Sequence, residues 1–76
     1  ANDHTAKRTV TTNDVVSILD KLVAEGPIAT ELAKTNVNQE LADMGILKNG
    51  VGIRFKQAIE KFPKNDGKIL PRAKVV

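Results

Sequence analysis

Three polar side chains in the last third of the sequence have types and spacing that suit contact with base edges. Arg54, Gln57 and Lys61 follow one another at i, i+3 and i+7, so on a helix they would share one stripe. Arginine and glutamine can form bidentate hydrogen bonds with guanine and adenine edges. The stripe also fits the ordinary polar face of an amphipathic helix, on which Lys56 would pair with Glu60 at i+4.

Further polar residues surround this stripe. Lysine side chains there could contact phosphates, which position a protein on a duplex without reading its sequence. With Asn49 just ahead of the helix, the candidate nucleic-acid-binding residues are Lys48, Asn49, Arg54, Lys56, Gln57, Lys61, Lys64 and Lys68.

Charge is unevenly distributed along the chain of 76 residues. The net charge is +1 over residues 1–11, −4 over residues 12–46 and +6 over residues 47–76, which gives +3 in all. Such asymmetry between halves favours a polyanionic partner. It also allows a second arrangement, in which the acidic part of one copy meets the basic part of another.

Composition argues against several other functions. The chain has no cysteine and one histidine, His4, so we expect no metal site. It lacks the glycine-rich phosphate loop ending in Gly-Lys-Ser/Thr and any residue set suited to nucleophilic catalysis, so we expect no enzymatic activity and no cofactor. Phe55 and Phe62 are the only aromatic residues, which disfavours stacking on single strands and leaves duplex DNA as the favoured partner. No apolar run approaches ~20 residues, so we expect a cytoplasmic protein that does not bind membranes.

Apolar periodicity predicts helices. Val15, Ile18, Leu19, Leu22 and Val23 predict a first helix, capped by Thr12 or Asn13 with Asp14 in its first turn and ended by Gly26-Pro27. A second helix would start at Pro27, turn Ile28 and Leu32 inward and stop near Thr35-Asn36. Asn38 could cap a short third helix with Leu41 and Met44 inward. Val51, Phe55, Ala58, Ile59 and Phe62 predict the last helix, ended by Pro63.

Residues 39–62 resemble helix-turn-helix DNA-binding domains of the phage-repressor type. The resemblance runs through Gln39-Glu40, Ala42-Asp43, Met44-Gly45 and Gly50-Val51-Gly52 with Phe55. Leu41 stands where that family has a small residue, and Arg54 stands where it has an apolar one. The resemblance implies that Asn49, Arg54, Gln57 and Lys61 face DNA, that the basic ends follow the backbone, and that the protein acts as a dimeric regulator of transcription.

The same segment is similar to the C-terminal part of sterile alpha motif domains. The matching residues are Glu40-Leu41, Met44-Gly45-Ile46, Gly50 and Ala58-Ile59. This similarity implies a protein-interaction or self-assembly domain, in which Lys48, Asn49 and Arg54 bind an acidic region with Glu31, Glu40 and Asp43 on a neighbouring copy. A helix-hairpin-helix clamp on phosphates through Gly50-Val51-Gly52 is a third reading of the segment.

The sequence therefore predicts an all-α protein, a small bundle of about four short helices with flexible basic termini. Its parts would be a flexible arm over residues 1–11, a helical domain over 12–63 and a basic tail over 64–76. We expect a non-enzymatic module that binds duplex DNA through the last helix and tails, with a self-assembling interaction domain as the alternative.

Overall fold

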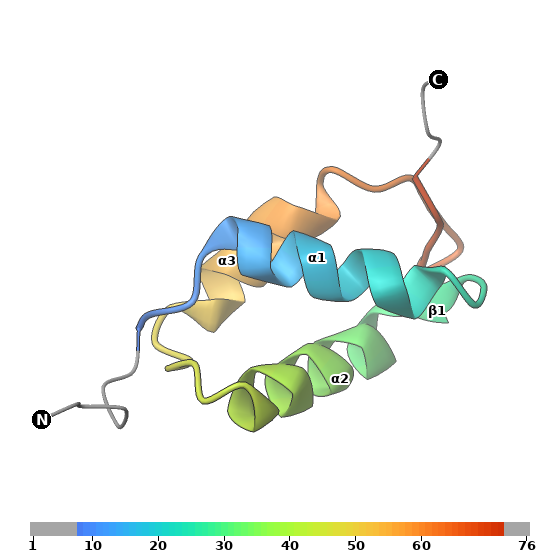
Figure 1. The fold of residues 1–76 in the computed structure, drawn as a ribbon. Helices are drawn as coiled ribbons and strands as arrows, with labels where there is room; N and C mark the ends of the chain where they lie inside the picture. Colours follow the sequence, from blue (N-terminus) through green and yellow to red (C-terminus); the bar gives the residue numbers. More distant parts are fainter. Residues whose placement is uncertain (1–7, 73–76) are drawn as a thin grey trace, which may run out of the picture.

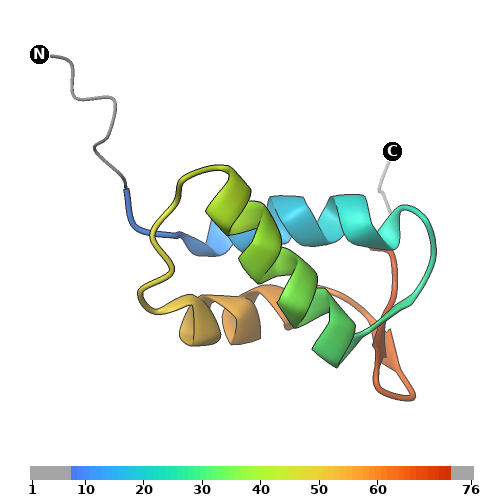
Figure 2. The same ribbon diagram turned by 90° about the horizontal axis from the view of Figure 1, so that it is seen from below.

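The computed structural model describes residues 8–72, which form three helices and one small antiparallel sheet (Figure 1). The elements are α1 (Thr12–Val23), β1 (Ile28–Ala29), α2 (Thr30–Asp43), α3 (Val51–Ile59), β2 (Lys64–Asn65) and β3 (Lys68–Ile69). The predicted all-α bundle of four short helices is therefore wrong, because the fold is mixed α/β. Figure 2 shows α2 running obliquely across α1 and α3.

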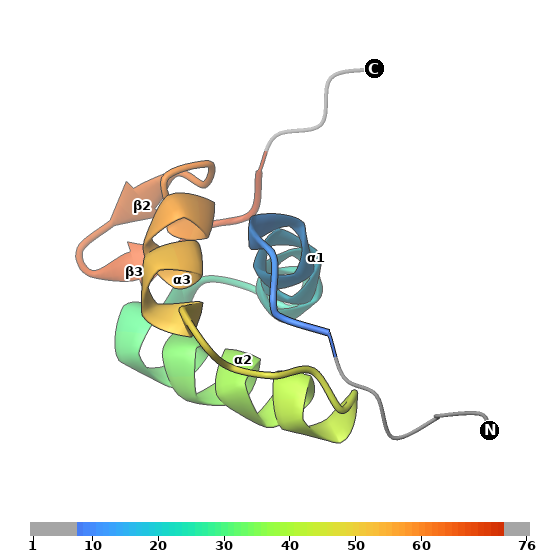
Figure 3. The same ribbon diagram turned by 90° about the vertical axis from the view of Figure 1, so that its left-hand side faces the viewer.

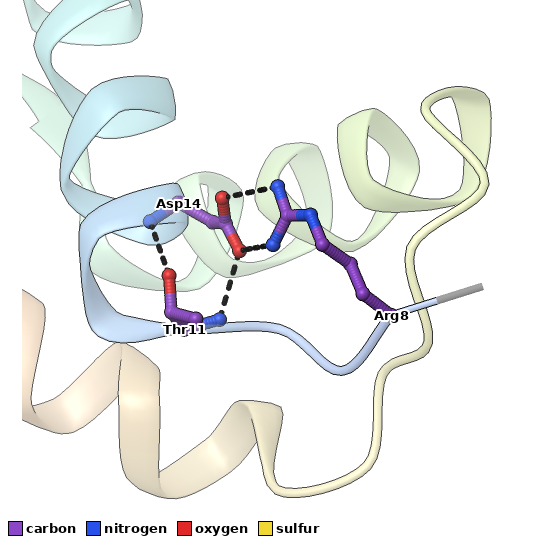
Figure 4. A network of polar contacts seen from close by, with 3 residues as sticks. All are labelled: Arg8, Thr11 and Asp14. Atoms are coloured by element: carbon purple, nitrogen blue, oxygen red, sulfur yellow. Dashed lines mark hydrogen bonds and ion pairs between the residues drawn. The ribbon is translucent and has the colours of Figure 1, made fainter.

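α1 begins one residue earlier than the caps considered above, at a reciprocal capping box (Figure 4). The Thr11 side chain accepts a hydrogen bond from the Asp14 backbone N–H (3.2 Å), and the Asp14 carboxylate accepts one from the Thr11 N–H (2.8 Å). The Arg8 guanidinium donates two more bonds to Asp14, at 2.7 and 2.8 Å. The hydrogen bonds from Arg8 and then those from Thr11 hold the pKa of Asp14 well below its ordinary range.

One continuous helix, α2, replaces the two short helices predicted over residues 27–44. Ala33, Val37 and Leu41 are fully buried at i, i+4 and i+8, and this single stripe extends through the predicted break at Thr35-Asn36. The Thr35 hydroxyl donates a hydrogen bond to the Glu31 carbonyl (3.3 Å), so its hydrogen-bonding requirement is met within the helix. Leu32 and Met44, which were predicted to point inward, are each 54% exposed.

The sheet joins segments from distant parts of the chain in the order β1-β3-β2. β2 and β3 form a hairpin in which Asn65 pairs with Lys68, and Asp66 and Gly67 occupy its turn with φ of 55° and 76°. Two central residues with positive φ match a type I′ turn, which suits the twist of the strands. The Gly67 carbonyl accepts hydrogen bonds from the backbone N–H and the hydroxyl of Thr30, both at 3.1 Å, so the hairpin turn is bound to the start of α2.

The core lies between the three helices and the sheet, and α1 packs most extensively against α3. Its buried side chains are Val10, Val15, Val16, Ile18, Leu19, Val23, Ala33, Val37, Leu41, Ile46, Phe55, Ala58, Phe62 and Ile69. Residues from both expected flexible ends thus belong to the folded unit. Val10 donates its N–H to the Leu47 carbonyl (3.1 Å), and the Leu47 N–H bonds to the Arg8 carbonyl (2.9 Å). Residues 1–7 and 73–76, the remainder of the expected arm and tail, lie outside the described residues.

Replacing Asp14 by asparagine should lower the free energy of unfolding by about 1–2 kcal/mol near neutral pH, because Asn cannot accept all the bonds that the carboxylate accepts. The folded-state pKa of Asp14 is lowered, so its contribution is complete above about pH 4 and is lost as the pH falls below that value. Urea denaturation at about pH 7 and about pH 3 should show a smaller difference between wild type and variant at the lower pH. Glu25→Gln, in the exposed turn after α1, is the control; an Asp14→Asn difference of equal size at both pH values would contradict this account.

Two glycine substitutions should have opposite effects. Gly67→Ala should destabilise the protein by about 1–2 kcal/mol, because φ of 76° is unfavourable for a residue with Cβ. Gly52→Ala should stabilise it by up to about 1 kcal/mol, because Gly52 lies in α3 and its added Cβ would meet nothing within 4 Å. Thermal denaturation measures both changes, and a Gly67→Ala variant as stable as wild type would argue against the turn.

Candidate nucleic-acid interface

Lys48 and Asn49 precede α3 in a turn that exposes both side chains. Gly50 closes this turn in the left-handed region (φ 77°), and the Val51 N–H bonds to the Lys48 carbonyl (3.1 Å). Glycine reaches that conformation without the penalty that a Cβ brings. The turn therefore places both residues at the N-terminal end of α3, where an approaching ligand could contact them.

α3 has a buried side and a solvent side. Phe55 and Ala58 are buried in the core, with Val51 and Ile59 half-buried beside them. The solvent side carries the exposed residues Gly52, Ile53, Lys56, Gln57 and Glu60. Ile53, at 61% exposure, is the most exposed large apolar side chain among residues 8–72.

Only part of the predicted stripe lies on α3, because the helix ends at Ile59, before the expected end at Pro63: Arg54 and Gln57 lie on the helix, and Lys61 lies in the turn after it. Arg54 is half-buried. The Gln57 side-chain oxygen accepts a hydrogen bond from the Thr12 hydroxyl at 2.8 Å. Gln57 and Lys61 also line an open hollow together with Thr11, Thr12, Asn13 and Glu60. The structure thus brings Gln57 and Lys61 together beside the start of α1, whereas Arg54 does not line this hollow.

The two candidate lysines of the hairpin differ in their surroundings. Figure 3 shows the hairpin beside the C-terminal half of α3. The Lys64 ammonium donates to the Ile59 carbonyl (2.7 Å) and the Phe62 carbonyl (3.1 Å), so it caps the C-terminal end of α3. Lys68 is exposed, while its neighbour Ile69 is fully buried. Since successive side chains of a strand point to opposite faces, Lys68 is directed away from the core.

Every ion pair between residues 8–72 uses a carboxylate of α1. Arg8 pairs with Asp14, and Arg72 pairs with Asp20 through bonds of 2.7 and 3.1 Å while its guanidinium lies over the Phe62 ring, 5.1 Å from the centroid. The alternative pairing of Lys56 with Glu60 does not occur within 4.0 Å. Within the same described residues, the candidate cations without a carboxylate within 4.0 Å are Lys48, Arg54, Lys56, Lys61, Lys64 and Lys68.

The structure adds residues that the sequence reasoning missed. Asn65 and Asp66 are exposed at the tip of the hairpin, within the segment that was predicted to be a tail. The Asp66-Gly67 dipeptide is a strong hairpin signal and could have revealed it. Ile53 was also missed, because it lies outside the apolar stripe of α3 and therefore had no predicted role.

Other kinds of site find no support in residues 8–72. In that range no group of three or more His, Cys, Asp or Glu side chains could hold a metal ion. No helix there has the length and apolar character required to cross a membrane.

We compared the chain with known protein families, curated proteins and solved structures, and it matches none of them.

Lys64→Gln and Lys68→Gln should separate a structural lysine from a surface lysine. Losing the Lys64 bonds to two carbonyls at the end of α3 should lower the free energy of unfolding by about 0.5–1.5 kcal/mol. Lys68→Gln should change it by less than about 0.5 kcal/mol, because its exposed ammonium forms no such bond. Urea denaturation compares the two variants, and equal losses would show that Lys64 has no special structural role.

Proposed function

We propose that this protein is a non-enzymatic module that binds duplex DNA through the turn before α3, the solvent side of α3 and the hairpin. The observation that carries the proposal is the separation of its charges. Two carboxylates of α1 form ion pairs with Arg8 and Arg72. In contrast, Lys48, Lys56 and Lys68 are exposed and have no ionic partner among residues 8–72. Cations in this state can neutralise phosphates without first breaking an ion pair in the protein.

The dimensions of α3 suit the major groove. An α-helix with its side chains is about 10–12 Å across, and the major groove is about 12 Å wide, so the groove can admit the solvent side of α3. Asn49 would be directed to base edges from the turn before α3, because amide side chains can pair with adenine. Gln57 would exchange its hydrogen bond from Thr12 for a base edge. Arg54 would act from α3, and Lys61 would act from the turn after it, next to the start of α1. Lys64 is assigned chiefly to the α3 cap.

The flanking regions would add phosphate contacts. Lys48 lies ahead of α3 and Lys68 lies on β3, so the two are carried by different elements. Phosphate contacts on both flanks of a helix fix its register on the duplex. A cytoplasmic regulator of transcription is the role that such binding fits.

Fluorescence anisotropy with a labelled duplex tests the proposal at several salt concentrations. If Lys48, Arg54, Lys56, Lys61 and Lys68 all contact phosphate, the logarithm of the binding constant should fall with the logarithm of salt concentration with a slope of about −4 to −5. Lys56→Gln should weaken binding and reduce that slope by about 1.

Lys34→Gln is the matched control, because it removes the same charge from an exposed position on α2. It should leave affinity almost unchanged. Absence of binding by the wild type at low salt would reject the proposal. Equal losses for Lys34→Gln and Lys56→Gln would reject α3 as the interface, because they would reflect net charge alone.

A further inference from the structure

The turn before α3 contains the only asparagine of the chain that is followed by glycine. Asn49 and Gly50 are both exposed. The Val51 N–H closes the turn by bonding to the Lys48 carbonyl (3.1 Å), and φ of 77° with ψ of 14° places Gly50 at the third position of a type II turn. Within residues 8–72 the Gly50 N–H donates no backbone hydrogen bond. This nitrogen is therefore free to react with the side chain that precedes it.

An asparagine amide can react with the backbone nitrogen of the next residue. The Gly50 nitrogen attacks Cγ of Asn49 and forms an N–Cγ bond. The Cγ–Nδ2 bond breaks, and Nδ2 leaves as ammonia with the proton of the Gly50 N–H. One water molecule then opens the resulting five-membered succinimide, either at the new N–Cγ bond, which gives aspartate, or at the original peptide bond, which gives isoaspartate. Both products carry a carboxylate in place of the neutral amide, and water is the only co-reactant.

The surroundings of Gly50 favour this attack. Glycine has no side chain to shield its nitrogen, and a Cβ added at Gly50 would meet no atom within 4 Å. The attack requires rotation about the bond between Cα and the carbonyl carbon of Asn49. One backbone hydrogen bond closes the turn, so local opening costs much less free energy than unfolding of the whole protein.

The other asparagines among residues 8–72 are placed less favourably. Three of them lie within α1 or α2, where the helical hydrogen bonds resist the rotation: Asn13, Asn36 and Asn38. Asn65 is exposed at the hairpin, as Asn49 is in its turn, but the residue that follows it is Asp66, which carries a side chain. Asn49 is therefore the asparagine in which exposure, an open turn and a following glycine coincide.

We propose that Asn49 is a site of spontaneous deamidation, and that the carboxylate formed there lowers the affinity for duplex DNA as the protein ages. The effect on DNA rests on the duplex binding proposed above, whereas the deamidation itself does not. The new carboxylate would stand beside exposed Lys48, where it would offset the ammonium charge and repel phosphates. It would also replace the amide that is suited to pair with adenine.

Deamidation should leave the fold intact. The first turn of α3 contains no acidic residue, and its N-cap, Gly50, has no side chain to accept a hydrogen bond. A carboxylate near the N-terminal end of a helix interacts favourably with the helix dipole. The protein would thus lose affinity for the duplex without losing stability, which distinguishes this change from ordinary damage to the core.

Incubation of the purified protein in mildly alkaline buffer, followed by digestion and mass spectrometry, tests the modification. Trypsin separates the asparagines, with Asn49 in residues 49–54, Asn65 in residues 65–68 and the two of α2 in residues 35–48. The peptide of residues 49–54 should gain the mass that corresponds to exchange of NH for O well before the other two. An intact Asn49 after long incubation, or equal rates at Asn49 and Asn65, would overturn the proposal.

Fluorescence anisotropy with a labelled duplex of mixed sequence tests the consequence. At low salt, Asn49→Asp should bind at least about tenfold more weakly than the fresh wild type, with a midpoint of thermal denaturation that is unchanged or higher. Ser17→Asp is the control, because it adds the same charge at an exposed position on α1 and should leave affinity almost unchanged. Asn49→Gln should keep its affinity on ageing, because glutamine would have to form a six-membered ring.

The two measurements separate this proposal from duplex binding itself. A fresh wild type that does not bind the duplex would reject the proposed function and the loss of affinity with it, while the mass measurement would still decide whether Asn49 deamidates. A fresh wild type that binds, together with a deamidated protein that binds equally well, would overturn the effect on affinity alone.

Discussion

The packing of α1 against α3 is the interaction on which the rest of the structure depends. α1 contributes Val15, Ile18 and Leu19 to the core, and α3 contributes Phe55 and Ala58. Burial of apolar surface is the main force that stabilises so small a fold, and with no cysteine there is no disulfide to assist it. Because α3 is held on one side by this contact, its opposite side must face solvent.

α1 also organises the charges of the protein. Asp14 near its start binds Arg8, and Asp20 nearer its end binds Arg72, so the segments that enter and leave the fold are both bound to this helix. Arg72 lies over Phe62 as well, which links the segment after the hairpin to the end of α3. An exposed pair such as that of Arg72 with Asp20 contributes little stability individually. The larger effect of the two pairs is on charge, since they neutralise two carboxylates of α1 while the lysines near α3 have no such partner within residues 8–72.

Apolar spacing predicted α1 and α3 because each buries a stripe that is continuous in sequence. The prediction of two helices in place of α2 is wrong. Thr35 and Asn36 are weak helix formers, but burial of the stripe of Ala33, Val37 and Leu41 outweighs their local propensity. The sheet was missed for a different reason. Its strands have two residues each, too few to display alternation, and β1 pairs with β3 across about forty residues of chain. Only the Asp66-Gly67 turn gave a local signal.

The candidate interface shows the same limit at the level of side chains. Spacing predicted that Arg54, Gln57 and Lys61 share one helical stripe. It could not reveal that α3 ends before Lys61, or that the start of α1 lies beside Gln57 and engages it. It likewise gave Lys56 and Lys64 the same role, although Lys64 caps α3 and Lys56 extends into solvent. The spacing between residues in the sequence determines which of them lie on the same side of a helix. Contacts from other elements decide whether its charge remains available to a partner, and here they leave that charge chiefly on the turn before α3, on α3 itself and on β3.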